Sequence, residues 1–540
     1  MPEEILKTIK PREYQQEIYN SCKDQNCLVI LPTGIGKTLI ALMLAINRIK
    51  KYPTSKVLFL APTRPLAQQH LEYFKKHLPE LFAEMSLFTG KIEAKQREKI
   101  WQTTEIIFST PQCIANDLKK GLYGLEEVSL LIEDECHRCV KNYAYTFVAQ
   151  KYLEQSSNPR VLGLTASPGT EKTIIQQIAK NLGIEKIELR TRESEDVKQY
   201  LQELNFKAIK VEFPEEISKI RDLIKKMLQR KIAELQHRRL LFKPPMKRYI
   251  LECQANIMRS LNSGNKNMNL MMGASAASQA IKLEHLVELI ETQTLASAND
   301  YFKNIFQQAK EQTTKAVQHI IKQPEFNQAY ILLTELITRK QEHPKVAKAK
   351  EIIEGIIKQN PKAKVIIFSQ FRLTSQKLTE ELNKINNIKA KMFVGQSSKK
   401  DSKGEKTGLN QKEQNQIINE FKSGEINVLC STSIGEEGLD IPEVNAVIFY
   451  EPIPSAIRKI QRAGRTARLM KGELFILITQ DTRDEGYYYA SIGKEKKMHK
   501  AIKDIKDKMD LENSVQNAIQ NSNENKNQSG NNLHPQKTLF

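Results

Sequence analysis

The stretch that decides the fold reads Leu31-Pro32-Thr33-Gly34-Ile35-Gly36-Lys37-Thr38. A loop that holds phosphates needs inward-pointing backbone N–H groups, a helix N-terminus behind them and a lysine for the outer phosphates. Gly34 and Gly36 permit the tight backbone, and we expect Thr33 to contact the nucleotide as well. Lys37 supplies the positive charge, and Thr38 the hydroxyl that would ligate Mg²⁺. The sequence therefore predicts a nucleotide-binding loop between a strand and a helix.

Short apolar runs of strand length recur along the chain, each followed by a plausible helix. In the first third they are Cys27–Leu31, Val57–Ala61, Ile106–Ser109, Leu130–Glu133 and Val161–Leu164. The pattern returns between residues 364 and 479 with Val365–Phe368, Val428–Cys430, Ala446–Tyr450 and Leu474–Ile478. Such runs are typical of parallel sheets that helices cover on both faces. The sequence thus predicts an α/β fold with two similar parallel-sheet domains.

The segment between these domains, residues 191–344, has a different pattern. Strand-like runs disappear, and apolar residues recur at helical spacing, as in Ile217, Ile220, Leu223, Ile224 and Leu228. This predicts an all-helical insert. Within it, residues 219–248 are strongly basic and include Arg238 and Arg239. Two interpretations stay open for this stretch: a solvated helix face, or an arm that binds phosphates.

A second chemical motif follows the strand-like run 130–133. Asp134 can hold Mg²⁺ at the end of the strand, and Glu135 can polarise the water that attacks a phosphate. Near the other end of the chain, Arg465 and Arg468 are spaced to share one helix face. Such arginines stabilise charge that develops on a γ-phosphate, and we expect Gln461 to line the same cleft. A nucleotide held between two domains is the arrangement of a translocating ATPase.

The bulk composition points to an acidic partner. The chain has 540 residues and a formal net charge of +20, which favours nucleic acid first and an anionic membrane second. No apolar run approaches the roughly 20 residues of a membrane span, and residues 1–10 carry no signal-peptide pattern. The seven scattered cysteines suit a reducing compartment. We expect a cytoplasmic, nucleoid-associated protein without a membrane partner.

Taken together, the motifs resemble those of the superfamily 2 DNA and RNA helicases, which have two RecA-like domains. This resemblance implies that ATP and Mg²⁺ are the cofactors, with Arg12 and Gln15 reading the adenine. It further implies nucleotide contacts from Gly438 and Asp440 of the second domain. Nucleic acid is then expected to contact residues of the strand-gripping motifs of both domains: Thr63, Arg64, Thr89, Gly90, Thr110, Gln370, Arg372 and Thr432.

Within this superfamily the chain most resembles the Hef family, archaeal helicases related to the FANCM group that act at stalled forks and branched DNA. The likeness lies in the DECH box 134–137, the helical insert and the segment 408–414. In that family the insert is compared to a polymerase thumb that grips branched duplex. No nuclease pattern of the XPF type stands before Phe540. The resemblance therefore implies unwinding or remodelling without strand cleavage.

The end of the chain has a composition of its own. Residues 513–532 are rich in Asn, Gln and Ser, which predicts a flexible linker. The terminal Gln536, Leu539 and Phe540 resemble the start of a box that binds the sliding clamp PCNA. An accidental terminus explains residues 536–540 equally well, so both interpretations stand.

The expected organisation has four parts: 1–190 as the ATP-binding domain, 191–344 as the thumb-like insert, 345–510 as the second RecA-like domain and 511–540 as a disordered polar tail. The leading functional hypothesis is an ATP-dependent DNA helicase or translocase that remodels forked or branched DNA. An ATPase activated by duplex RNA is the alternative in the same motor class. A non-catalytic scaffold for branched DNA is the alternative in another class.

Overall fold

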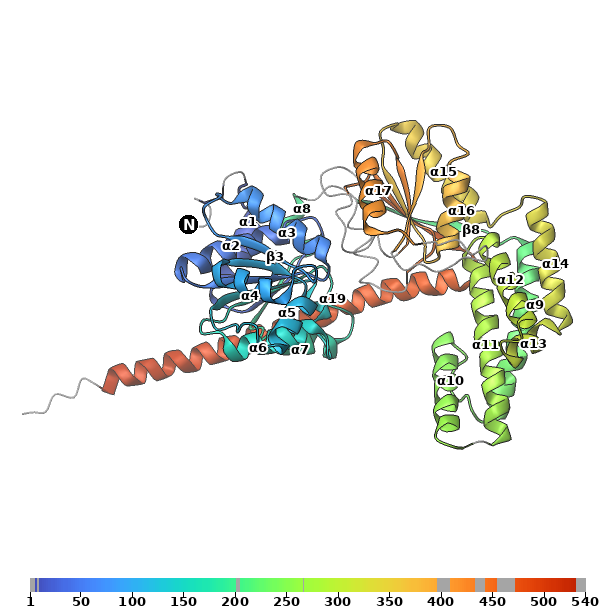
Figure 1. The fold of residues 1–540 in the computed structure, drawn as a ribbon, viewed down its shortest axis with the longest axis horizontal. Coiled ribbons are helices and arrows are strands. Elements are labelled where there is room, and N and C mark those ends of the chain that lie inside the picture. The colour runs from blue at the N-terminus through green and yellow to red at the C-terminus, as the bar shows by residue number, and fades with distance from the viewer. Residues whose placement is uncertain are drawn as a thin grey trace, which may run out of the picture.

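The computed structural model describes residues 5–6, 9–200, 204–265, 267–395, 408–432, 442–453 and 472–530. Two α/β units lie beside each other, a helical bundle lies against the second unit, and one long helix runs beneath both units (Figure 1). This arrangement confirms the predicted fold class, two parallel sheets with a helical insert.

The first sheet has seven parallel strands. In spatial order they are β3 (Met85–Phe88), β4 (Ile106–Ser109), β2 (Lys56–Leu60), β5 (Val128–Asp134), β6 (Val161–Thr165), β1 (Cys27–Ile30) and β7 (Lys186–Leu189). The five predicted strands of this sheet are confirmed. The two edge strands, β3 and β7, were not predicted. Their polar residues interrupt the apolar runs, because an edge strand is only partly buried.

Helices cover both faces of this sheet and build a separate core on each. One core uses α1 (Glu13–Asp24), α2 (Lys37–Lys51) and α3 (Arg64–His77). The other core uses α4 (Ala94–Thr103), α5 (Pro111–Lys119), α6 (Ala144–Gln155) and α7 (Lys172–Asn181). The short helix α8 (Glu195–Lys198) follows β7. Since α2 and α3 each follow a central strand, the loops before them meet at the carboxyl edge of the sheet.

The second sheet has six parallel strands. They run in the order β10 (Ala390–Phe393), β11 (Val428–Ser431), β9 (Val365–Phe368), β12 (Ala446–Phe449), β13 (Gly472–Thr479) and β8 (Leu204–Val211). Their packed helices include α15 (Pro344–Gln359), α16 (Arg372–Leu382) and α17 (Gln411–Ser423).

The strand β8 corrects the predicted start of the insert. Residues 191–344 were expected to be all-helical, but 204–211 pair with β13 along their whole length. The sequence alternates apolar with polar residues there, which is typical of a half-exposed strand at the sheet edge. The helical part begins at Glu215. It contains α9 (Glu215–His237), α10 (Lys247–Asn262), α11 (Met268–Thr292), α12 (Leu295–Lys310), α13 (Lys315–Ile321) and α14 (Pro324–Thr338) around one apolar core.

The long helix α19 (Arg483–Gly530) connects the parts of the molecule. It begins directly after β13, and its buried Met498, Ile502 and Ile505 join the second core of the first α/β unit. The helix continues to Gly530, so the prediction of a disordered tail is wrong for residues 511–530. A helix that is already nucleated lengthens at little cost, which permits helix in a polar stretch. Gln536, Leu539 and Phe540 lie outside the described residues.

Candidate functional site

The glycine-rich loop has the backbone that its sequence predicts. Gly34 and Gly36 adopt φ values of 85° and 87°, which other residues rarely tolerate. The helix α2 starts at Lys37 directly after them. Lys37 Nζ donates to the carbonyl oxygens of Leu31 and Pro32 at 3.1 and 3.4 Å. The helix N-terminus and the lysine ammonium therefore lie on one small loop, as phosphate binding requires.

Gln15 of the first helix braces this loop from behind. Gln15 is buried, and its Nε2 donates to the carbonyl oxygens of Ile35 and Gly36 at 3.2 and 3.4 Å. Its Oε1 accepts from the backbone N–H of Arg12 at 2.9 Å. The Arg12 guanidinium lies over the ring of Tyr200, 4.7 Å from its centroid. The structure thus gives Gln15 a contact with the loop, while adenine recognition by Arg12 and Gln15 stays a prediction.

The acidic motif lies next to this loop, at the end of the central strand β5. Asp134 is the last residue of the strand, and Glu135 follows it with a left-handed φ of 53°. His70 Nε2 lies 3.0 Å from Asp134 Oδ2. Burial by itself would raise the pKa of Asp134, but the hydrogen bond from His70 and the nearby charge of Lys37 outweigh it and lower this pKa. Asp134 is therefore held as a carboxylate.

Two histidines beside the acids, His70 and His137, were not among the predicted site residues. His70 is buried on α3, and its Nδ1 lies 3.5 Å from Thr38 Oγ1. His137 belongs to the DECH box, and its Nδ1 lies 3.2 Å from Thr165 Oγ1 and 3.3 Å from Glu135 Oε2. The contact of His70 with Thr38 and that of His137 with Thr165 cannot be found from spacing, because each partner comes from a different strand or helix. The only available signal for His70 was a histidine at the spacing of the buried face of α3, which also carries Ala67, Phe74 and His77.

The residues near Lys37 suit a magnesium ion. Thr38 Oγ1 and the Asp134 carboxylate are hard oxygen donors that contact the two nitrogens of one imidazole ring. Mg²⁺ prefers such oxygens, and in nucleotide sites it is usually held by one or two protein ligands and the substrate phosphates. Within the described part of the chain, no group of three or more His, Cys, Asp or Glu forms a different metal site. By their chemistry Thr38 and Asp134 are the residues that would hold the ion, and this assignment stays a prediction.

The contributions predicted from the second domain cannot be placed. Gly438, Asp440, Gln461, Arg465 and Arg468 lie outside the described residues. Their assignment to the nucleotide stays a prediction.

The predicted nucleic-acid contacts gather at the carboxyl edges of both sheets. Thr63 and Thr110 stand directly before α3 and α5, Thr89 and Gly90 follow β3, and Thr432 follows β11. On the second sheet, Arg372 begins α16, and its Nη2 donates to the carbonyl oxygen of Gly395 at 3.4 Å. The backbone N–H of Gln370 donates to Glu451 Oε1 at 2.6 Å. Parallel topology thus brings residues from distant segments to one edge of each sheet.

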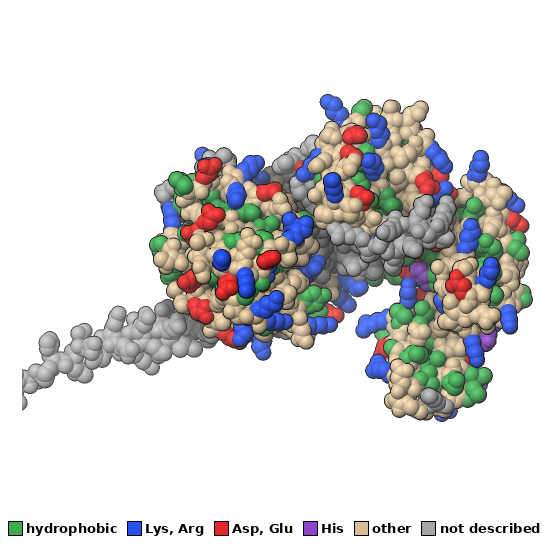
Figure 2. Space-filling view, in the orientation of Figure 1, with side chains coloured by type: hydrophobic (Ala, Val, Ile, Leu, Met, Phe, Trp, Pro, Cys, Tyr) green, Lys and Arg blue, Asp and Glu red, His purple; other side chains and the backbone are tan. Residues whose placement is uncertain are grey.

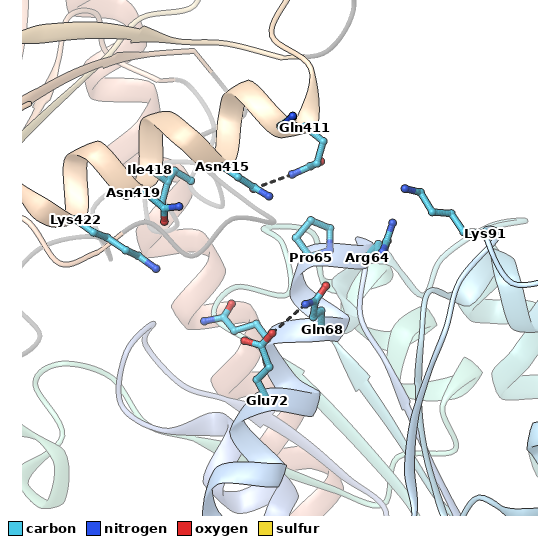
Figure 3. Close-up of a pocket in the computed structure, with 12 residues that line it drawn as sticks. Arg64, Pro65, Gln68, Glu72, Lys91, Gln411, Asn415, Ile418, Asn419 and Lys422 are labelled. Atoms are coloured by element: carbon cyan, nitrogen blue, oxygen red, sulfur yellow. Dashed lines mark hydrogen bonds between the residues drawn. The ribbon is translucent and has the colours of Figure 1, made fainter.

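A cleft of about 710 Å³ separates α3 from α17 (Figure 3). Four basic residues lie around it, Arg64 and Lys91 from the first α/β unit and Lys412 and Lys422 from the second, against one acid, Glu72. Glutamine and asparagine side chains supply most of the remaining lining: Gln68, Gln69, Gln411, Asn415 and Asn419. Cations and amides without large aromatic surfaces suit a phosphate backbone. Of the predicted strand contacts, only Arg64 lines this cleft.

Arg238 and Arg239 lie apart from the cleft, at the end of α9 in the helical bundle. Arg238 Nη2 forms an ion pair with Glu234 at 3.1 Å, and its Nη1 donates to Asn269 at 3.2 Å. Arg239 is exposed and adopts a φ of 56°. On the face shown in Figure 2, basic side chains are interspersed with acidic ones over the bundle. Both interpretations of the basic stretch therefore stay open, and Arg239 is the more accessible of the two arginines.

Helices that could cross a membrane are lacking among the described residues, since none is both long and apolar enough.

Three families match successive parts of the chain. The DEAD/DEAH box helicase family matches residues 12–174, the RNA helicase helical bundle matches 216–341, and the helicase conserved C-terminal domain matches 345–470. The matches follow the order of the first α/β unit, the bundle and the second α/β unit.

Curated relatives are similar over most of the chain. A protein of Methanocaldococcus jannaschii, provisionally named an ATP-dependent RNA helicase, is 36% identical over 92% of this chain and 61% of its own length. The Fanconi anemia group M protein homolog of Mus musculus is 33% identical over 91% of this chain and 26% of its own. The ATP-dependent DNA helicase mph1 of Neurospora crassa is 32% identical over 88% of this chain and 41% of its own length. The chain thus spans between 26% and 61% of the length of these relatives.

A solved structure is similar over its whole length. The crystal structure of the Pyrococcus furiosus Hef helicase domain is 43% identical, with a TM-score of 0.69, and the match covers 90% of this chain and 100% of that one.

Proposed function

This chain belongs to the Hef type of superfamily 2 DEAD/DEAH-box helicases, and on that premise we propose that it couples ATP hydrolysis to the remodelling of forked or branched DNA. The observation that carries the proposal is the contact of His70 with both Thr38 and Asp134. It brings the phosphate loop and the acidic strand end together as one site for nucleotide chemistry.

The nucleotide chemistry follows from the groups at this site. Lys37 and the N-terminus of α2 bind the outer phosphates. Magnesium, when bound, neutralises charge on the phosphates. Glu135 orients the attacking water, since it lies next to Asp134 at the strand end. Arg465 and Arg468 of the second domain complete this proposal by stabilising the charge that develops on the γ-phosphate.

The cleft between α3 and α17 is the proposed path of the nucleic-acid strand. Its two walls belong to different α/β units, so a change in their separation moves the two sets of phosphate contacts relative to each other. Contacts from Arg64, Lys91, Lys412 and Lys422 to phosphates carry no base information. Movement along the strand is therefore expected to be largely independent of sequence.

DNA is the preferred substrate in this proposal, because the similar proteins of Mus musculus, Neurospora crassa and Pyrococcus furiosus are named as a Fanconi anemia group M protein, a DNA helicase and Hef. Duplex RNA is the second candidate. The Methanocaldococcus jannaschii relative and the helical-bundle family both carry the name of an RNA helicase. Binding of PCNA through Gln536, Leu539 and Phe540 stays a separate prediction.

The test is ATP hydrolysis by the purified chain with no nucleic acid, linear duplex DNA, forked DNA or duplex RNA. Lys37→Ala is the blank, because it removes the ammonium from the phosphate loop. Strongest stimulation by forked DNA supports the proposal. Stimulation chiefly by duplex RNA contradicts DNA as the substrate and supports an RNA-activated ATPase. Hydrolysis in none of the four conditions contradicts both and favours a non-catalytic scaffold.

A further inference from the structure

His70 contacts both proposed magnesium ligands. Its Nε2 lies 3.0 Å from Asp134 Oδ2, and its Nδ1 lies 3.5 Å from Thr38 Oγ1. Its ring centroid is 4.4 Å from that of Phe59 on β2, and the residue is only 8% exposed. The imidazole is thus fixed by packing as well as by polar contacts.

The two contacts assign a role to each ring nitrogen. A carboxylate only accepts hydrogen bonds, so Nε2 carries the proton and donates it to Asp134. In a neutral ring, Nδ1 is then an acceptor, and the Thr38 hydroxyl donates to it. This donation turns the hydroxyl hydrogen toward the ring and leaves oxygen lone pairs of Thr38 for a cation. His70 therefore orients Thr38 Oγ1 and the Asp134 carboxylate toward the ion without being a ligand itself.

The helix that carries His70 also forms one wall of the cleft. Arg64, Pro65, Gln68, Gln69 and Glu72 of α3 line it, and Gln69 directly precedes His70 in the chain. Figure 3 shows Arg64, Pro65, Gln68 and Glu72 facing α17 across the cleft. An α-helix transmits displacement along its length as a stiff element. A strand that shifts the exposed face of α3 therefore shifts the buried imidazole with it.

We propose that His70 is a positioning residue that couples occupancy of the α3–α17 cleft to the geometry of the Thr38–Asp134 pair. This inference rests on the proposed function, because it takes that pair as the magnesium site and the cleft as the strand path. It adds a specific route by which nucleic acid stimulates hydrolysis.

The test compares three variants of the full chain. His70→Phe keeps the ring and its packing on Phe59 but removes both polar contacts. His70→Gln keeps a donor toward Asp134 and loses the acceptor for Thr38. His77→Phe is the matched control, since His77 is also buried on α3 and packs on Tyr73, at 4.5 Å between ring centroids. Thermal unfolding identifies any variant that fails to fold.

The first measurement is binding of a fluorescent ATP analogue, with Mg²⁺ absent and then titrated. For His70→Phe we expect unchanged binding without Mg²⁺ and a roughly 10- to 100-fold higher Mg²⁺ concentration at half-saturation. The Mg²⁺ concentration at half-saturation of His70→Gln should lie between that of His70→Phe and that of the unmodified protein. The second measurement is turnover with and without forked DNA, where His70→Phe should lose most of the stimulation and His77→Phe should keep it.

Three results would overturn this coupling role. One is a Mg²⁺ titration of His70→Phe that matches the unmodified protein. Another is full stimulation by DNA in His70→Phe despite weakened Mg²⁺ binding. A third is an equal loss in His77→Phe. If the unmodified protein shows neither Mg²⁺-dependent nucleotide binding nor turnover, the proposed function itself has failed.

Discussion

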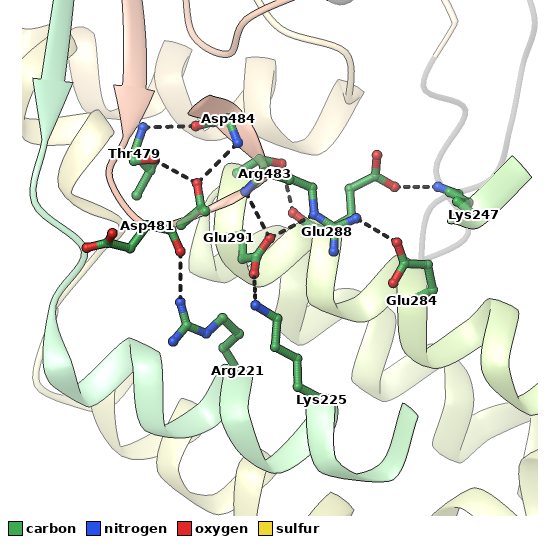
Figure 4. Close-up of polar contacts among 12 residues, drawn as sticks. Arg221, Lys225, Lys247, Glu284, Glu288, Glu291, Thr479, Asp481, Arg483 and Asp484 are labelled. Carbon is green, nitrogen blue, oxygen red and sulfur yellow. Dashed lines mark hydrogen bonds and ion pairs between the residues drawn. The ribbon is translucent and has the colours of Figure 1, made fainter. Parts of the chain in front are cut away.

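Lys345 Nζ lies 2.8 Å from Asp484 Oδ2, and neither side chain has any exposed surface. Lys345 comes from the first turn of α15 and Asp484 from the first turn of α19, and the pair lies at the carboxyl end of β13, where the backbone N–H of Thr479 also donates to Asp484. The adjacent Arg483 contacts the bundle instead, with Nη1 3.0 Å from Glu284 and Nε 2.8 Å from Glu291 (Figure 4). Two neighbouring residues thus fasten the long helix to the sheet and to the insert.

We expect Lys345→Met to destabilise the protein strongly. The substitution leaves the Asp484 carboxyl buried without its cation, and breaking such a pair on one side costs roughly 3–5 kcal/mol. Lys348→Met is the control, because Lys348 pairs with Glu351, whose side chain is 68% exposed, and exposed pairs contribute about 0–1 kcal/mol. Urea unfolding measured by circular dichroism compares the two. Equal midpoints would show that the buried pair has no special role.

Glu133 should give the protein a measurable dependence of stability on pH. It is fully buried in β5, and burial raises its pKa well above the ordinary value, an effect that the nearby Cys139 thiol only partly offsets. The native state therefore keeps a proton that the unfolded chain releases, so stability falls as the pH rises above about 4.3. Glu133→Gln removes this loss and should raise the melting temperature at pH 7 more than at pH 4.5. A constant difference between the two pH values would contradict the assignment.

Gly36→Ala should weaken nucleotide binding for two separate reasons. The φ of 87° is unfavourable for any residue with a Cβ, at a cost of about 1–2 kcal/mol. The added Cβ would also lie 2.2 Å from Gln15 Nε2 and displace this side chain from the loop. Binding of a fluorescent ATP analogue measures the effect. Gly355→Ala in α15 is the control, since no atom lies within 4 Å of its added Cβ and alanine favours the helix.

The basic end of α9 should be tested by salt dependence. If this end of α9 binds phosphates of a fork, Arg239→Ala should weaken the binding of forked DNA more than that of linear duplex. It should also reduce the slope of log affinity against log salt concentration by about one. Arg64→Ala in the cleft should weaken the binding of forked DNA and of linear duplex to the same extent. Fluorescence anisotropy over a range of salt concentrations measures both variants. Unchanged affinity of Arg239→Ala for forked DNA would establish the solvated-face interpretation.

The sequence predicted the central strands and missed edge strands. Cys27–Ile30 and Val365–Phe368 are fully buried, so their residues are apolar throughout and stand out locally. Two of the missed edge strands form because their backbones pair with a neighbouring strand: Leu204–Val211 pairs with β13, and Lys186–Leu189 pairs with β1. Pairing of this kind depends on partners far along the chain, and a window of neighbouring residues does not contain that information.

What the sequence determined by itself is the local chemistry: a glycine loop whose backbone only those residues adopt, and a carboxylate at the end of an apolar strand. These features depend on a few consecutive residues, so they are encoded where they occur. Only the tertiary structure decided that His70 contacts both Thr38 and Asp134, and that α19 joins the core of the first unit. Sheet order and helix packing bring such residues together, and both are set by the burial of the whole chain.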